Sequence, residues 1–251
     1  MKTRRTFLKL LFGAFAVILP WTVFPDKIVE KMNNIIGEPQ AILEFPPPSE
    51  VKSGIEIKAL SRKAIEDIEV LTSENFEGRR ACTAGDIKTE NYLVEKLIEI
   101  GLKGFGKSGF VQIFSIPPME ERIINGRALF RAAKTGLSMP SSNVLGGIEG
   151  ENKSEIIIIS AHFDHLGIYK GNLCPGANDN ASGVGCVLEV LRRLVKDELE
   201  DEKLKCTVVG VFWGAEEMGY LGSKHFVKDP VIPLENIKAV INLDTVANGN
   251  K

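Results

Sequence analysis

Three apolar runs rich in isoleucine and valine most constrain the fold of this chain. They span Glu155–Ser160, Lys205–Trp213 and Ala239–Leu243, and polar residues hardly alternate with apolar ones along them. Such runs are typical of strands that are covered on both faces. Between the first two, Gly183–Leu194 has apolar residues at helical spacing, which predicts an amphipathic helix. The strand–helix–strand order predicts an α/β fold, with a sheet flanked by helices.

The chain upstream of these runs adds further elements. Ile87–Ile100 has apolar residues at helical spacing, and Gly101 stands where a helix C-terminus favours glycine. Three segments are predicted to be strands: Val111–Ile116, Arg127–Ala133 and Asn143–Gly147.

The N-terminal residues predict a segment outside the fold. A charged stretch with Arg4 and Arg5 precedes the apolar residues Leu10–Phe24, which is the arrangement of an export signal. The apolar stretch is shorter than the ~20 residues that cross a bilayer as a helix. The arginine pair resembles the twin-arginine motif, although an arginine-rich secretory signal is an alternative. We predict an export signal or N-terminal anchor over 1–25, a Pro-rich linker over 26–54, and export across the cytoplasmic membrane.

Charge and cysteine content narrow the range of partners. The net charge of −2 provides no electrostatic attraction for nucleic acid or acidic membranes. We therefore expect no nucleic-acid partner, and membrane contact only through the N-terminal segment if it is uncleaved. None of the four cysteines forms a CxxC pair, which excludes a zinc finger. A disulfide between Cys82 and Cys174 is left open.

Polar side chains that can bind metals follow the buried strands. These side chains are His162, Asp164 and His165 after the first run, Asp179 in the loop that opens the helix, Glu216 and Glu217 after the second run, and Asp244 after the third. Ligands gather beyond the carboxyl ends of strands in such sheets. One carboxylate there is explained by helix capping, but clustered carboxylates repel each other and favour a cation. Histidine with carboxylates and no thiolate suits zinc or a similar divalent metal.

Four segments carry a resemblance to a known family. "SAHFDHLG", "PGANDNASGVG", "FWGAEEMGYLGSKHFV" and "VINLD" resemble the motifs of metallopeptidase family 28, the co-catalytic zinc aminopeptidases, in the family's order. Upstream, "ENFEGRRACTAGD" and "SSNVLGGIEG" are also similar to the family. The resemblance runs from about Leu60 to Asp244. It implies a mixed, largely parallel central sheet flanked by helices, as in zinc-dependent exopeptidases, and a peptide substrate.

The resemblance also implies a set of zinc ligands. His162 and Asp244 would bind one zinc, Glu217 would bind a second, and Asp179 would bridge the two. It further implies a cis peptide bond between Asp179 and Asn180.

Three neighbouring residues receive other assignments from the resemblance. Glu216 would be the general base, because a carboxylate beside a ligand that does not itself bind metal can accept a proton from a metal-activated water. Asp164 would orient the ligand His162. His165 matches a histidine common in the aminopeptidase branch and is given no metal role.

The family pattern needs one more histidine ligand, downstream of the Asp244 position. The chain ends at Lys251, and its one remaining histidine, His225, is predicted on a helix surface. We therefore expect a truncated or interrupted reading frame, in which residues 55–251 form an incomplete zinc aminopeptidase-like catalytic domain without its last strands and helices. One tightly bound zinc and impaired activity follow from this expectation.

Two other functions remain open at this stage. A glutaminyl-peptide cyclase shares the fold and uses one zinc, but His165 argues against it, since cyclases generally carry a different residue there. A non-catalytic binding domain on the same scaffold fits the missing histidine, but it has no need for the general base Glu216. The leading prediction is a metal-dependent aminopeptidase that hydrolyses N-terminal residues of peptides.

Overall fold

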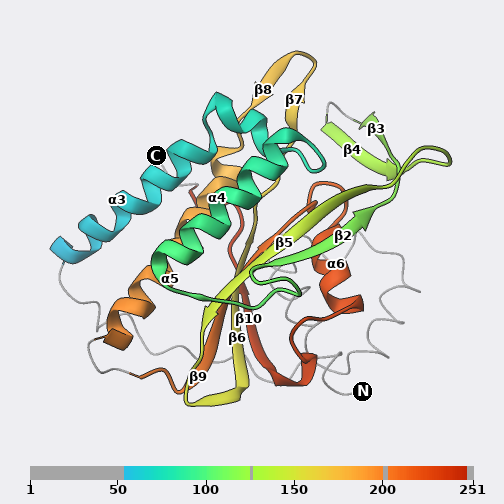
Figure 1. Cartoon of the computed structure of the whole chain (residues 1–251). Coiled ribbons are helices and arrows are strands. Elements are labelled where there is room, and N and C mark those ends of the chain that lie inside the picture. Colours follow the sequence, from blue (N-terminus) through green and yellow to red (C-terminus); the bar gives the residue numbers. More distant parts are fainter. Residues whose placement is uncertain (1–53, 125–126, 200–202, 248–251) are drawn as a thin grey trace, which may run out of the picture.

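The fold is a central sheet with helices on both faces (Figure 1). The computed structural model describes residues 54–124, 127–199 and 203–247. The predicted export signal and all but the last residue of the predicted linker lie outside these ranges. Within them, no helix combines the length and the apolar character needed to cross a membrane.

The sheet is mixed, as predicted. Its strands are β1 (Lys103–Gly104), β2 (Val111–Ile116), β5 (Met139–Ile148), β6 (Asn152–His162), β9 (Cys206–Trp213) and β10 (Ile237–Asn242). They lie in the order β1-β5-β9-β6-β10, with β2 also paired to β5. Strand β6 runs parallel to both of its neighbours, β9 and β10, whereas β5 is antiparallel to β9, β2 and β1.

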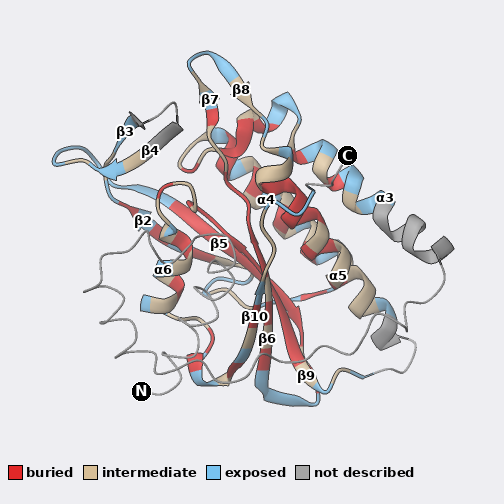
Figure 2. Ribbon diagram, turned by 180° about the vertical axis from the view of Figure 1, so that it is seen from behind, coloured by how far each residue is buried: buried red, intermediate tan, exposed pale blue. Residues whose placement is uncertain are grey.

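Helices cover the two faces unequally. Three long helices pack on one face: α3 (Gly54–Leu71), α4 (Ala84–Ile100) and α5 (Ser182–Leu199). The short helix α6 (Leu221–Lys228) packs on the other. Adjacent residues of β5 separate the two cores, because Val144 belongs to the cluster with α4 and α5, and Leu145 to the cluster with Phe226 of α6. Figure 2 shows the buried residues concentrated in the sheet and in the helix faces against it.

Most predicted elements are present, with shifted ends. Helix α4 contains the predicted Ile87–Ile100, and Gly101 follows at φ 89°, donating its N–H to the carbonyl of Ile98. Strand β9 is buried along nearly its whole length, as predicted. The expectation that β10 is covered on both faces is wrong: Ile241 is 44% exposed. Among the described residues, β10 has only β6 as a neighbour, so it is an edge strand.

Several short elements were not predicted. They are the hairpins β3–β4 (Met119–Ile124, Arg127–Ala132) and β7–β8 (Gly167–Tyr169, Asn172–Cys174), and the turns η2 (Glu74–Arg79), η3 (Ala177–Ala181) and η4 (Leu234–Asn236). The exception among them is β4, which the sequence predicted as a strand over Arg127–Ala133. All four cysteines are free, including Cys82 and Cys174.

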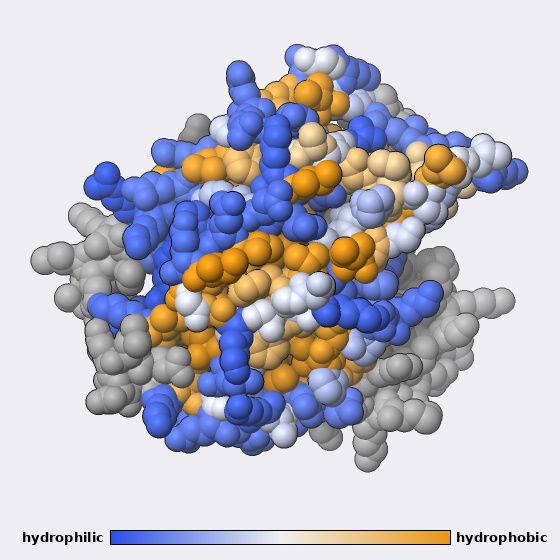
Figure 3. All heavy atoms as spheres, in the orientation of Figure 1, coloured by the Kyte–Doolittle hydropathy of each residue, from blue (hydrophilic) through white to orange (hydrophobic). Residues whose placement is uncertain are grey.

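The outer surface of the helical layer is not uniformly polar. Ile87 and Ile98 of α4 are 62% and 59% exposed. Figure 3, in the orientation of Figure 1, shows apolar side chains gathered across the middle of this face between hydrophilic regions. Apolar residues of the helical layer therefore differ in burial. Truncating one that is buried and one that is exposed tests how the helices pack.

Truncating a buried leucine of α5 tests that packing. Leu188 is fully buried between α5 and the sheet, so Leu188→Ala is expected to lower the free energy of unfolding by about 2–5 kcal/mol in urea denaturation. Ile98→Ala on the exposed side of α4 is the control, and its effect is expected to stay within about 0.5 kcal/mol. Equal losses for the two variants would contradict the arrangement of the helical layer.

Candidate metal centre

Parallel pairing brings the predicted site residues to one edge of the sheet. His162 at the end of β6 lies opposite Trp213 at the end of β9, and Ser160 lies opposite Asn242 at the end of β10. The loops that follow these three strands therefore start side by side. They carry the histidines, the Glu216–Glu217 pair and Asp244, as the sequence predicted for the carboxyl ends of parallel strands.

A first cluster forms around the buried ring of His162, which is 2% exposed. Its Nε2 lies 3.1 Å from Asp179 Oδ1 and 3.6 Å from Asp244 Oδ1. Its Nδ1 lies 3.1 Å from the backbone carbonyl of Asp164. A proton on Nδ1 satisfies that carbonyl and leaves Nε2 directed at the two carboxylates, which is the usual arrangement of a metal-binding histidine.

A second cluster lies on the other side of Asp179. His165 Nδ1 is 2.8 Å from Glu217 Oε1. One donor atom from each of His165, Asp179 and Glu217 lies within 4.8 Å of the others, as in the first cluster of His162, Asp179 and Asp244. Asp179 thus belongs to both clusters, and its peptide bond to Asn180 is cis, as the resemblance implied. The resemblance assigned His165 no metal role, so its place in the second cluster is a finding of the structure.

The carboxylate of Asp164 fixes the acidic pair. It is fully buried, and it accepts the backbone N–H of Glu216 at 2.8 Å and that of Glu217 at 3.2 Å. Its Oδ1 also lies 3.7 Å from Nδ1 of His162. Asp164 therefore holds the strand end of β6 against the loop after β9, which extends its predicted part in orienting His162.

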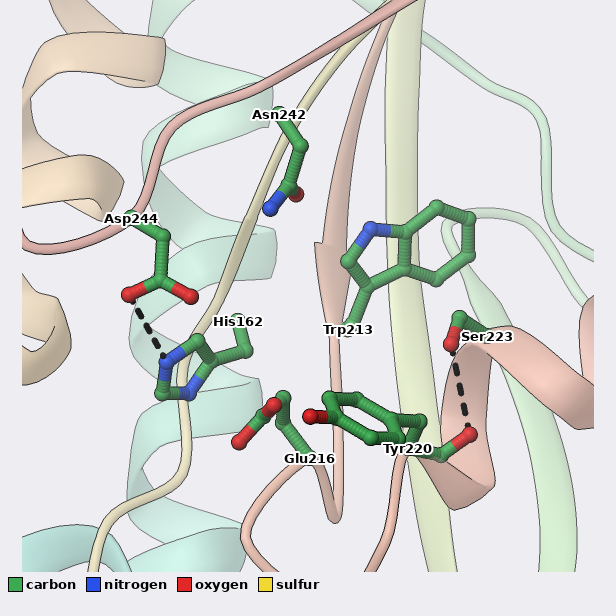
Figure 4. Close-up of a pocket in the computed structure, with 7 residues that line it drawn as sticks. All are labelled: His162, Trp213, Glu216, Tyr220, Ser223, Asn242 and Asp244. Carbon is green, nitrogen blue, oxygen red and sulfur yellow. Dashed lines mark hydrogen bonds and ion pairs between the residues drawn. The ribbon is translucent and has the colours of Figure 1, made fainter. Parts of the chain in front are cut away.

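The two neighbouring glutamates point to different places. Glu216 lines a small pocket, partly open to solvent, together with His162, Asp244 and four other residues. In Figure 4 its side chain lies between His162 and Tyr220. Glu217 instead contacts His165. Because Ala215 adopts a left-handed conformation, with φ 53°, the chain turns sharply before the pair.

The electrostatics reflect an excess of negative charge. Burial raises the pKa of Glu216 to about 8, and the nearby carboxylates raise it as well, whereas His162 lowers it. Burial by itself would lower the pKa of His162, but hydrogen bonds with Asp164, Asp179 and Asp244 raise it well above its usual value. The hydrogen bond with His162 in turn lowers the pKa of Asp179. Such a field attracts cations.

A buried arginine that the sequence analysis did not single out holds together the loops that carry the site. Arg79 is fully buried. Its guanidinium donates to the backbone carbonyls of Leu71, Phe163, Pro175 and Gly176 at 2.7–2.8 Å. It therefore connects the loop after β6 with the segment that precedes Asp179. The motif "ENFEGRRACTAGD" contained this residue, but nothing in the local pattern indicates that Arg79 is buried and Arg80 is not.

Two asparagines were also missed. Asn180 donates to the Leu243 carbonyl at 2.9 Å and accepts the Thr245 N–H at 3.2 Å, so it ties the Asp179 turn to the backbone on either side of Asp244. Asn143, fully buried on β5, accepts the N–H of Gly214 and donates to the carbonyl of Gly222. It thereby fixes both ends of the loop that carries the glutamates.

The donor set fits zinc. Each cluster offers one imidazole and two carboxylates within a span that one ion can bridge, and three protein ligands with an open position are typical of catalytic zinc sites. Cysteine thiols are absent from both clusters, which also suits other borderline divalent metals. The Asp164 carboxylate accepts backbone N–H groups, and the Asn180 side chain bonds to backbone groups beside Asp244, which supplies the outer support that such ligands usually have.

Comparison with known proteins finds a family whose model matches part of the chain. A model of peptidase family M28 matches residues 143–251. The residues from Asn143 onwards are therefore similar to this peptidase family. The match begins at Asn143 and contains every predicted site residue. The segment "ENFEGRRACTAGD" lies before the match, and "SSNVLGGIEG" lies within it except for Ser141 and Ser142.

Two relatives that the chain resembles in sequence are named aminopeptidases. An aminopeptidase of Pseudomonas aeruginosa is 34% identical over 110 residues, which are 43% of this chain and 18% of that protein. Aminopeptidase YwaD of Bacillus subtilis is 33% identical over 96 residues, 38% of this chain and 19% of the relative. The matched part of this chain thus spans about a fifth of the length of these relatives.

Solved structures share the fold beyond the family match. A zinc aminopeptidase from Bacillus subtilis superposes with a TM-score of 0.57 at 19% identity, covering 74% of this chain and 69% of that chain. A glutaminyl cyclase from Porphyromonas gingivalis gives a TM-score of 0.54 at 23% identity, covering 74% and 59%. These two confirm the exopeptidase-like fold, which alone does not separate the two activities.

Removing the Asn143 side chain tests the support of the acidic loop. Asn143→Ala leaves the N–H of Gly214 without its partner, at a cost of about 1–3 kcal/mol for an unpaired buried group. It also removes the contact with the carbonyl of Gly222. We expect a corresponding fall in the free energy of unfolding, measured in urea. The exposed Asn172 of β8 is the control, since Asn172→Ala removes only a 3.4 Å contact with Lys170. A loss no larger than the control's would show that Asn143 does not hold the loop.

Proposed function

We propose that this protein is a metal-dependent aminopeptidase that removes N-terminal residues from peptides. The divergence of Glu216 and Glu217 carries the proposal. One glutamate faces the pocket next to His162, and its neighbour faces His165 and Asp179. A ligand and a proton acceptor are thereby separated within two adjacent positions. The aminopeptidase relatives support the same reaction.

The metal would be held by the two clusters that share Asp179. His162, Asp179 and Asp244 would bind one zinc, and Glu217 with Asp179 would contribute to a second. Bound zinc in such a site polarises the scissile carbonyl and lowers the pKa of a water molecule towards neutrality.

The chain's own residues would then position the substrate and move the proton. Glu216 would accept a proton from the attacking water and pass it to the leaving amine. The Asp164 carboxylate keeps Glu216 in place, because it accepts a hydrogen bond from the backbone N–H of Glu216 at 2.8 Å. Trp213 and Tyr220 line the same pocket (Figure 4) and would shield the reacting groups from bulk water.

Replacing Glu216 separates proton transfer from metal binding. Glu216→Gln keeps the size of the side chain but removes the base, so hydrolysis of amino-acyl anilides should fall by about 10²–10⁴-fold or more. Zinc content, measured by mass spectrometry after dialysis, should stay that of the unmodified protein. Loss of zinc would mean that the roles of Glu216 and Glu217 are exchanged.

The exposed Glu235 provides a matched control. It lies in η4, away from the pocket residues, so Glu235→Gln should leave both rate and zinc content unchanged.

An assay of the same protein preparation distinguishes the alternative activity. Conversion of N-terminal glutamine to a cyclic residue, without release of an amino acid from the anilides, would support a glutaminyl-peptide cyclase instead.

We also propose that the protein is exported by the twin-arginine route. The support is the sequence alone, with Arg4 and Arg5 before the apolar stretch. Changing both arginines to lysine keeps the charge and should retain the protein in the cytoplasm, as measured by cell fractionation. Lys2→Arg is the control and should leave export unchanged. Undiminished export of the double variant would indicate the general secretory route.

A further inference from the structure

We infer that His165 supplies the imidazole of a second metal site, which it forms with Glu217 and Asp179. The inference rests on the proposed metal-dependent function and deepens it. Among the residues that the structure describes, His165 is the histidine that lies with Glu217 and Asp179. With His165, the two clusters have the same composition: each has one histidine, one carboxylate that belongs to it alone, and the shared Asp179.

The position of the imidazole carries the inference. His165 Nδ1 lies 2.8 Å from Glu217 Oε1. One ring nitrogen of His165 and one carboxylate oxygen each of Glu217 and Asp179 lie within 4.8 Å of one another. The side chains of His165 and Glu217 are only 13% and 21% exposed. The Asp179 side chain is 45% exposed, so a cation among the three would be shielded by His165 and Glu217 and would keep access to water beside Asp179.

The ring of His165 is held in place on its other side. A Cβ on Gly176 would come within 2.6 Å of Cγ and Cδ2 of His165, so the ring lies directly against the Gly176 backbone. The backbone N–H of His165 donates to the Arg79 carbonyl at 3.3 Å, and the Arg79 guanidinium donates to the Gly176 carbonyl at 2.8 Å. This packing fixes the direction of Nδ1 before any ion binds.

The chemistry of a neutral imidazole permits the exchange of a hydrogen bond for a metal bond. One ring nitrogen carries the proton and the other has a free lone pair. When Nδ1 carries the proton, it donates to Glu217. When the proton is on Nε2, the lone pair of Nδ1 is free to bind an ion held by Glu217. An ion there would have three protein ligands, the number typical of catalytic zinc sites.

The remaining histidine of the chain does not compete for this role. His225 lies on α6, and its ring stacks on Phe114 with the centroids 5.4 Å apart. It belongs to neither cluster of metal-binding side chains in the described part of the chain. His225 therefore serves as the matched control for His165.

Metal counting on the full chain tests the inference. The protein is stripped with a chelator, reloaded with zinc, dialysed and analysed by mass spectrometry. The unmodified protein should retain two zinc ions per chain, and His165→Asn should retain one. Asparagine keeps a donor near the Nδ1 position, so the hydrogen bond to Glu217 survives while the imidazole is lost. His225→Asn should retain two. Retention of one ion by the unmodified protein, or of two by His165→Asn, would overturn the inference.

The size of the effect separates a ligand from a residue that only positions one. Loss of an outer partner of a metal ligand typically weakens affinity by 10–100-fold. The affinity of the second site in His165→Asn, from competition with a chelator, should fall by more than this. A fall within that range would assign His165 to holding Glu217 and would contradict ligation.

X-ray absorption at the zinc edge gives a reading that needs no variant. In the protein loaded with two ions, ligation by His162 and His165 should give an average of one imidazole per zinc. An average of half an imidazole would overturn the inference. Neither measurement uses activity. Two retained ions without hydrolysis of amino-acyl anilides would contradict the proposed function and leave the second metal site standing. Hydrolysis by a protein that retains one ion would support the proposed function and contradict the second metal site.

Discussion

The parallel pairing of β6 with β9 and β10 is the constraint on which the site depends. Because His162 lies opposite Trp213 and Ser160 opposite Asn242, the three strands end at the same edge. A shift of register would move the side chains that follow them by several ångströms. The site thus forms from segments far apart in the sequence only because the isoleucine- and valine-rich strands are buried in one register.

This arrangement places an excess of negative charge at the site. Burial and neighbouring carboxylates raise the pKa of Glu216 to about 8, and hydrogen bonds with carboxylates raise the pKa of His162. The surrounding protein holds these groups together through neutral hydrogen bonds from Asn180 and from backbone N–H groups to Asp164. Arg79 is the one buried cation among the described residues that binds these loops from beneath. The remaining imbalance is what a divalent cation would offset.

The sequence predicted those features that depend on local pattern. The uninterrupted apolar run of β9 and the helical spacing of α4 identified them as strand and helix, and the polar residues after each strand located the site. The position of His165 beside Glu217 was not predictable, because it depends on the contact between two loops 52 residues apart. Arg79 and Asn143 were missed for the same reason: their partners are backbone groups of distant segments. The edge position of β10 depends on which strands pair with it.

A zinc titration of the metal-free protein, followed by thermal unfolding, tests the central claim that Asp179 joins both clusters into one metal centre. An ion that binds only the folded chain stabilises it by about 2.7 kcal/mol at a hundredfold excess over the dissociation constant. The account predicts that zinc raises the unfolding temperature of the unmodified protein, and that Asp179→Asn loses most of this increase because both clusters lose a ligand. An equal increase in the two proteins, or none in the unmodified one, would contradict it.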